Sequence, residues 1–210
     1  MKWDKLQGKF IVLDGPDGCG KSTQVRLLAK ALEQTGIETL SLRDPGGTDI
    51  GEQIRHILLR NDNQAMSVRC ETLMYMASRA QLYEENIQPA LAAGKCVLCD
   101  RWLSSTYAYQ AVAGKIGVEW LEQLAAASLE RIWPDLTIII DVPSEIGLQR
   151  VGPAPDRMEE KSANFHQRVR QAFRDLARTH QRFIVIDGSG TIEQVHRRVL
   201  ELIESEYVHS

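Results

Sequence analysis

Residues 15–22 read Gly15-Pro16-Asp17-Gly18-Cys19-Gly20-Lys21-Ser22, which fits the phosphate-binding pattern G-x-x-x-x-G-K-[ST]. An apolar run at residues 9–14 precedes the loop and predicts a buried strand, and residues 23–32 have the apolar spacing of a helix. Backbone N–H groups and the positive end of the helix would surround phosphate oxygens. We therefore expect a nucleoside triphosphate to bind here. The expected phosphate-binding residues are Gly15, Gly18, Cys19, Gly20, Lys21, Ser22 and Thr23.

The composition is that of an ordinary globular protein. The 210 residues are 43% hydrophobic and 25% charged, with a net charge of −3. The length predicts one domain over residues 1–210. The acidic balance argues against a general nucleic-acid binder, which usually has a basic face. No run reaches the ~20 apolar residues of a membrane span, so we expect a cytoplasmic protein that binds neither nucleic acid nor membrane.

Strand-like and helix-like segments alternate along the whole chain. Short apolar runs predict five strands, at residues 9–14, 38–43, 96–99, 136–140 and 183–186. Helical spacing predicts helices at residues 23–32, 49–59, 68–93, 104–113, 118–131, 144–150, 161–178 and 191–204. Apolar strands separated by helices indicate a parallel sheet covered on both faces. The expected fold is a three-layer α/β P-loop kinase fold with a five-stranded parallel sheet.

Polar residues follow several of the predicted strands. Ligands of open parallel sheets bind beyond the carboxyl ends of the strands, so the P-loop, residues 44–48 and residues 100–101 should share one cleft. Asp100 stands where a Mg²⁺-associated carboxylate is expected, and Ser22 and Asp100 are the predicted metal-binding residues. Arg101 would hold a phosphate. Asp141 also ends a strand, but it precedes a turn with Pro143, which favours a structural role.

The cysteines and histidines do not indicate a metal or redox site. Cys96 and Cys99 have C-x-x-C spacing, but an odd offset on a strand places them on opposite faces, and no second pair completes a zinc site. We expect both to be buried structural residues. The five histidines fall on predicted polar helix faces or the tail, so we expect surface positions and no catalytic base. They are His56, His166, His180, His196 and His209.

The chain has features of a transferase with a second substrate. The guanine-reading motif N-K-x-D of GTPases does not follow any predicted strand. Tyr75 and Arg79 are four residues apart and share a face of the helix predicted at residues 68–93. Such a ring and guanidinium could stack on a base and hydrogen-bond its edge. On spacing alone, a tyrosine at such a position is more often a core residue, and an arginine four residues later is more often solvated.

A set of motifs, in this order, resembles bacterial thymidylate (dTMP) kinases over nearly the whole chain. The matching segments are residues 15–23, 43–48, 77–81, 100–102, 105–110 and 156–159, with Phe165 and residues 168–170. The resemblance implies a P-loop nucleoside monophosphate kinase domain. It also implies transfer of the γ-phosphate of ATP to dTMP with Mg²⁺, in dTTP biosynthesis, by a homodimer.

The resemblance also implies a role for individual residues of the acceptor site. Asp17 would bond the 3′-hydroxyl of the acceptor, Tyr75 would stack on thymine and Arg79 would bond the pyrimidine edge. Tyr109 would pack against the sugar, and Gln110 would face the base or the lid. The whole implied dTMP-binding set is Asp17, Asp44, Tyr75, Arg79, Arg101, Thr106, Tyr109 and Gln110.

The catalytic cation is expected in a short lid at about residues 151–160. Gly18 stands where another type of this family has an arginine in the P-loop, so the resemblance implies that a lid arginine does this work. Arg157 and Arg150 are the two candidates. With them, Lys21 and Arg101 complete the implied catalytic set. An acceptor phosphate is largely a dianion at pH 7, so it needs no general base.

Two alternatives stay open. One is a kinase of another acceptor, such as dUMP, dCMP or a deoxynucleoside, because one methyl group in an apolar pocket discriminates only ~10–200-fold. The other is a non-catalytic nucleotide-binding module. The intact Lys21, Ser22, Asp100 and Arg101 argue against that module.

Overall fold

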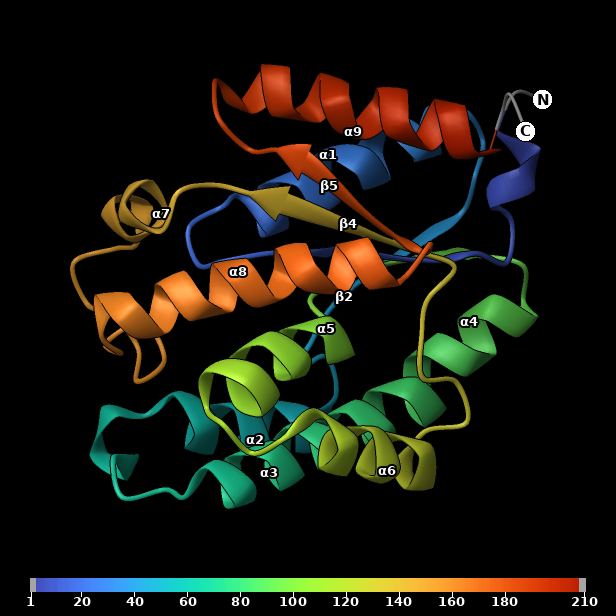
Figure 1. The fold of residues 1–210 in the computed structure, drawn as a ribbon. Helices are drawn as coiled ribbons and strands as arrows, with labels where there is room; N and C mark the ends of the chain where they lie inside the picture. Colours follow the sequence, from blue (N-terminus) through green and yellow to red (C-terminus); the bar gives the residue numbers. More distant parts are fainter. Residues whose placement is uncertain (1–2, 208–210) are drawn as a thin grey trace.

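A five-stranded sheet lies at the centre of the computed structural model, which describes residues 3–207 (Figure 1). Its strands are β1 (Phe10–Asp14), β2 (Thr39–Arg43), β3 (Cys96–Asp100), β4 (Leu136–Asp141) and β5 (Phe183–Asp187). All neighbouring strands are parallel, in the order β2-β3-β1-β4-β5. The predicted five-stranded parallel sheet is therefore confirmed.

The central strands are apolar because both of their faces are covered. β1 is buried at every position, and β3 and β4 are buried at every position except the last. The edge strand β2 has no fully buried residue. Cys96 belongs to the core on one face of the sheet and Cys99 to the core on the other. This confirms that both cysteines are buried and that they point to opposite faces.

Helices form the two outer layers. Figure 1 shows α1 and α9 on one face of the sheet and α3, α4, α5, α6 and α8 on the other. The helices are α1 (Lys21–Glu33), α2 (Asp49–Leu59), α3 (Val68–Leu82), α4 (Gln88–Ala92), α5 (Leu103–Thr106), α6 (Val118–Ser128), α7 (Ser144–Arg150), α8 (Ala163–Thr179) and α9 (Ile192–Tyr207). Within residues 3–207, none of them combines the length and hydrophobicity needed to span a bilayer.

Two predicted helices are interrupted by π-helical turns. The helix expected at residues 68–93 ends as α3 at Leu82, continues through a π-helix at Tyr83–Ile87 and resumes as α4. Pro89 lies in the first turn of α4, where its missing N–H is not needed. The helix expected at residues 104–113 is α5 followed by a π-helix at Tyr107–Ala113. This π-helix carries two of the predicted acceptor-site residues, Tyr109 and Gln110.

Candidate active site

One cleft of about 1600 Å³ lies at the carboxyl edge of the sheet. It is lined by residues 17–26 of the P-loop and α1, by residues 41–45 at the end of β2, and by Asp100 and Arg101. Gly188 and Gly190, after β5, lie at its other side. The predicted meeting of the strand ends in a shared cleft is confirmed.

The P-loop packs against α7 through backbone atoms alone. Gly18 has φ +70°, and a Cβ atom there would lie 1.9 Å from the carbonyl oxygen of Gly147. A Cβ atom on Gly147 would in turn lie 2.3 Å from the carbonyl oxygen of Asp17. Glycine is therefore required on both sides of this contact. The contact joins the loop to α7, the helix that leads into residues 151–160.

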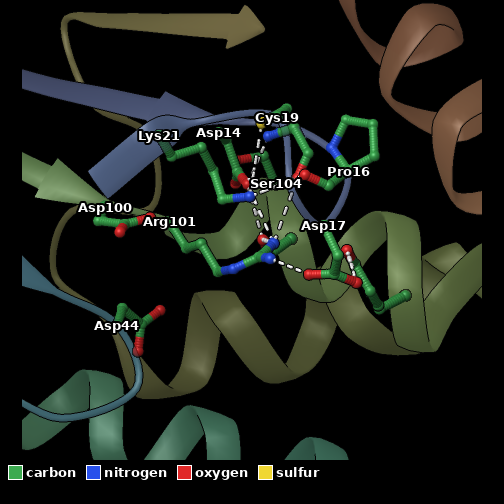
Figure 2. Close-up of polar contacts among 12 residues, drawn as sticks. Asp14, Pro16, Asp17, Cys19, Lys21, Asp44, Asp100, Arg101 and Ser104 are labelled. Atoms are coloured by element: carbon green, nitrogen blue, oxygen red, sulfur yellow. Dashed lines mark hydrogen bonds and ion pairs between the residues drawn. The ribbon is translucent and has the colours of Figure 1, made fainter. Parts of the chain in front are cut away.

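Lys21 lies buried beneath the P-loop (Figure 2). Its Nζ donates to the carbonyl oxygens of Pro16 and Gly15, at 2.9 and 3.1 Å. It also lies 3.5 Å from Sγ of Cys19. These contacts fix a positive charge at the turn where α1 begins, whose N-terminus adds its own partial positive charge.

Ser22 and Asp100 are in direct contact. The Ser22 hydroxyl donates to Oδ2 of Asp100, from the start of α1 to the end of β3. Both groups offer oxygen ligands, which Mg²⁺ prefers, and Mg²⁺ in phosphate-transfer sites takes few protein ligands besides the substrate phosphates. The residues present therefore fit a nucleotide-bound Mg²⁺ ion.

Asp17, Arg101 and Tyr109 form a polar cluster in the middle of the cleft. Arg101 binds Oδ1 of Asp17 through one nitrogen and donates to Ser105 Oγ, at 2.9 Å, through the other. The Tyr109 hydroxyl donates to Oδ2 of Asp17 at 2.7 Å. The Arg101 guanidinium also lies 5.2 Å from the centre of the Tyr109 ring. Figure 2 shows this ion pair joining the P-loop to the residue after β3.

The charges in this cluster stabilise one another. Burial alone would raise the pKa of Asp17, but Arg101 and Lys21 outweigh burial and hold that pKa below its ordinary value. Burial would likewise lower the pKa of Arg101, but Tyr109 and Asp17 raise it well above the ordinary value. The cluster therefore presents a fixed cation and a fixed carboxylate side by side.

Arg79 is buried, and it is fixed from two directions. Its Nε and one terminal nitrogen donate to Oδ2 of Asp44, at 2.7 and 2.5 Å, and the same terminal nitrogen lies 3.0 Å from Oγ1 of Thr106. Trp102 lies beneath the guanidinium, 5.3 Å away. Tyr75, one turn earlier on α3, is half-buried and lines the cleft with Arg79. The structure thus brings together the base-reading residues that the resemblance implied.

Gln110 is fixed by a buried ion pair. Its amide nitrogen donates to Oε1 of Glu71 at 2.7 Å, and Arg157 binds Oε2 of Glu71 at 2.5 Å. Arg157 also donates from Nε to the carbonyl oxygen of Leu58, at 2.8 Å.

The structure separates the two candidate lid arginines. Arg157 is 1% exposed and is not among the residues that line the cleft. Arg150, at the end of α7, is exposed and lines the cleft. Of the predicted catalytic cations, Lys21, Arg101 and Arg150 are brought together, whereas Arg157 is turned towards Glu71.

Glu71 was missed by the sequence reasoning although a signal for it existed. Glu71, Tyr75 and Arg79 are spaced by four residues, so all three share one face of α3. Ser105 was also assigned no role, yet its hydroxyl donates to Asp14 at 2.7 Å and accepts from Arg101. Both residues position others that line the cleft.

The prediction that the histidines lie at the surface is wrong for His166. This residue is 2% exposed, with Nε2 at 3.3 Å from the carbonyl oxygen of Glu159 and Nδ1 at 3.8 Å from Oδ2 of Asp17. The loop at Glu159 covers the part of α8 that carries His166. The spacing of apolar residues along the helix does not reveal this cover. His56 is exposed as expected, His180 and His196 are half-buried, and His209 lies outside the described residues.

Asp141 has the structural role that its sequence context favoured. Its two carboxylate oxygens accept from Nε and a terminal nitrogen of Arg170, at 2.7 and 2.9 Å. The pair joins the end of β4 to α8.

Comparisons with known proteins agree with this geometry. The family model described as thymidylate kinase matches residues 13–199. A thymidylate kinase of Caldanaerobacter subterraneus subsp. tengcongensis is 42% identical over 205 residues, which are 97% of this chain and 98% of that protein. One from Rhodopirellula baltica is 43% identical, over 90% of this chain and 77% of the relative. The crystal structure of thymidylate kinase from Ehrlichia chaffeensis superposes with a TM-score of 0.78 at 31% identity, covering 94% of this chain and 99% of the other.

Proposed function

The chain belongs to the thymidylate kinase family, and we propose how its cleft is divided between the two substrates of that reaction. The enzyme transfers the γ-phosphate of ATP to dTMP, giving dTDP and ADP, a step of dTTP biosynthesis. One observation carries the proposed division. Asp17 belongs to the P-loop yet bonds Arg101 and Tyr109, so the donor's phosphate loop forms part of a second binding site.

The donor nucleotide occupies the P-loop side of the cleft in this proposal. Backbone N–H groups of the loop hold its phosphates, and Lys21 contacts the β- and γ-phosphates. Ser22 and Asp100 would hold the Mg²⁺ ion that accompanies ATP, and the ion would supply positive charge to the phosphates. The adenine lies near residues 188–190, which follow β5. The lining of the cleft by Gly188 and Gly190 supports this position.

The acceptor occupies the other side. Arg101 holds its 5′-phosphate, because this guanidinium lines the cleft beside Asp17 and also donates to the carbonyl oxygen of Gly15 at 3.3 Å. Asp17 accepts from the 3′-hydroxyl, and Tyr109 packs against the sugar. Tyr75 stacks on the base while Arg79 donates to its edge, with Asp44 and Thr106 fixing the guanidinium.

The chemistry in this arrangement is positioning and charge neutralisation. The acceptor phosphate is already a dianion and attacks without help from a base. Lys21 and Arg150 offset the negative charge on the transferring phosphoryl group. We further propose that residues 1–210 form one domain in which residues 151–160 act as a lid, because a closed site protects ATP from hydrolysis. The active form in this proposal is a cytoplasmic homodimer.

Turnover of ATP with a panel of acceptors tests this proposal. We expect dTMP to be phosphorylated fastest, and dUMP to react ~10–200-fold more slowly in kcat/KM, because it lacks only the methyl group. Thymidine should not react, since it has no phosphate for Arg101 to hold, and its neutral hydroxyl would need a base to become a nucleophile. Faster reaction of dCMP or of a nucleoside would overturn the assignment of the acceptor side.

A further inference from the structure

Glu71 lies next to the cleft but does not line it. The residue is 4% exposed, and both of its carboxylate oxygens are occupied, one by Gln110 and one by Arg157. Arg157 is anchored in turn to the end of α2, through its side chain to Leu58 and its backbone N–H to Leu59. The carboxylate therefore has one fixed position between α3, the π-helix of Gln110 and the lid.

This carboxylate determines which end of the Gln110 amide faces the cleft. A carboxylate only accepts hydrogen bonds, so the nitrogen of the amide must point towards Glu71. The oxygen of the same amide then points away from Glu71, and it has no hydrogen bond to another residue between 3 and 207. Since Gln110 lines the cleft, the group that it offers to a ligand is an acceptor.

An acceptor beside the donors of Arg79 matches one kind of pyrimidine. Thymine and uracil both present a carbonyl acceptor at position 4 and an N–H donor at position 3. Cytosine presents the reverse, an amino donor at position 4 and an acceptor at position 3. Arg79 only donates hydrogen bonds, so it matches the carbonyl oxygen at position 4 of thymine or uracil. The amide oxygen of Gln110 accepts, so it matches the neighbouring N–H at position 3. Both contacts would be mismatched with cytosine.

We propose that Glu71, held by Arg157, is a positioning residue that fixes the amide of Gln110 and so excludes cytosine nucleotides from the acceptor site. The inference rests on the proposed function, because it takes Gln110 and Arg79 to face the base. It assigns the discrimination to a residue that touches no substrate. It also gives Arg157 a role in base recognition, through Glu71.

The isosteric variant Glu71→Gln tests this proposal sharply. Arg157 has only donors, so it takes the oxygen of the new amide and leaves the nitrogen facing Gln110. Gln110 must then turn its own oxygen towards residue 71 and its nitrogen towards the cleft. We expect kcat/KM for dTMP to fall and that for dCMP to rise, changing their ratio by about 10-fold or more, mainly through KM of the acceptor. The ratio of dUMP to dTMP should stay unchanged, because uracil and thymine present the same edge.

The same substitution in a Gln110→Ala background is the matched control. If Glu71 acts through Gln110, Glu71→Gln should leave the dCMP to dTMP ratio unchanged there, whereas a general loosening of the site would change it in both backgrounds. Should Glu71→Gln fail to fold, the pair Glu71→Leu with Arg157→Met replaces the ion pair without an unpaired charge. Dissociation constants for dTMP and dCMP without ATP then report the ratio independently of catalysis.

The outcomes separate the inference from the function on which it rests. An unchanged dCMP to dTMP ratio in folded Glu71→Gln protein overturns the inference while leaving dTMP phosphorylation by the wild type untouched. Failure of the wild type to phosphorylate dTMP would instead overturn the proposed function.

Discussion

Replacing Lys21 with alanine is expected to lower kcat for dTMP phosphorylation at least about 10³-fold, because a fixed charge on the transferring phosphoryl group is lost. The ammonium group is held beneath the P-loop by the carbonyl oxygens of Gly15 and Pro16. Its positive charge is therefore already at the turn of the P-loop, where the phosphates of the donor are expected to bind.

The fold should survive this substitution. The side chain of Lys21 bonds to its own loop, and the strands and helices around it are held by apolar cores. Thermal unfolding of the variant checks this, and steady-state kinetics with ATP and dTMP measures the loss. Lys95→Ala is the control, because Lys95 lies at the opposite end of β3 and pairs with Glu38. Full activity of Lys21→Ala would refute the assignment of the phosphate loop.

Arg150→Ala is expected to lower kcat by about 10³–10⁵, the range for loss of an arginine that stabilises a transferring phosphoryl group. The KM for dTMP should change little, since Arg150 lies at the end of α7, the helix that contacts the P-loop through Gly147. The variant should unfold at the same temperature as the wild type, because the Arg150 side chain is exposed. Arg150→Lys keeps the charge but not the planar fork, so it should recover only part of kcat.

Arg157→Ala is expected to act on stability instead. Its removal leaves the buried carboxylate of Glu71 without its cation, a change that typically costs about 3–5 kcal/mol. A fall in kcat of the same size as for Arg150→Ala, in Arg157→Ala protein that unfolds at the wild-type temperature, would reverse the two assignments. The sequence left Arg150 and Arg157 as equal candidates for the catalytic cation. Their contacts in the structure favour Arg150, which lines the cleft, over Arg157, which pairs with Glu71.

The parts of the fold that the sequence predicted are those set by local pattern. β1 and β4 are apolar runs of the length of a strand, and the P-loop has a fixed pattern between a strand and a helix. The π-helix at Tyr107–Ala113 could not be predicted, because its sequence has ordinary helical spacing and the extra residue in its turns leaves no local mark. The single helix predicted at residues 68–93 was wrong for the same reason, because a π-helix at Tyr83–Ile87 interrupts it.

The parts of the site that could not be predicted depend on contacts between distant segments. The residues of the P-loop and of β3 were placed correctly because parallel strands end at one edge. Arg157 looked like a free lid arginine until the structure placed it against Glu71, which lies 86 residues earlier in the chain. His166 lies on an amphipathic helix, but only the tertiary fold brings Glu159 and Asp17 to it.

The central claim is that one cleft holds ATP and dTMP together, with their phosphates meeting at Lys21 and Arg101. A molecule in which adenosine and thymidine are joined through their 5′-oxygens by a chain of five phosphates tests it directly. We expect this compound to compete with both ATP and dTMP, and to bind more tightly than either, because linking the two sites raises the effective concentration at the second. Competition with ATP alone, or binding no tighter than ATP, would contradict the account.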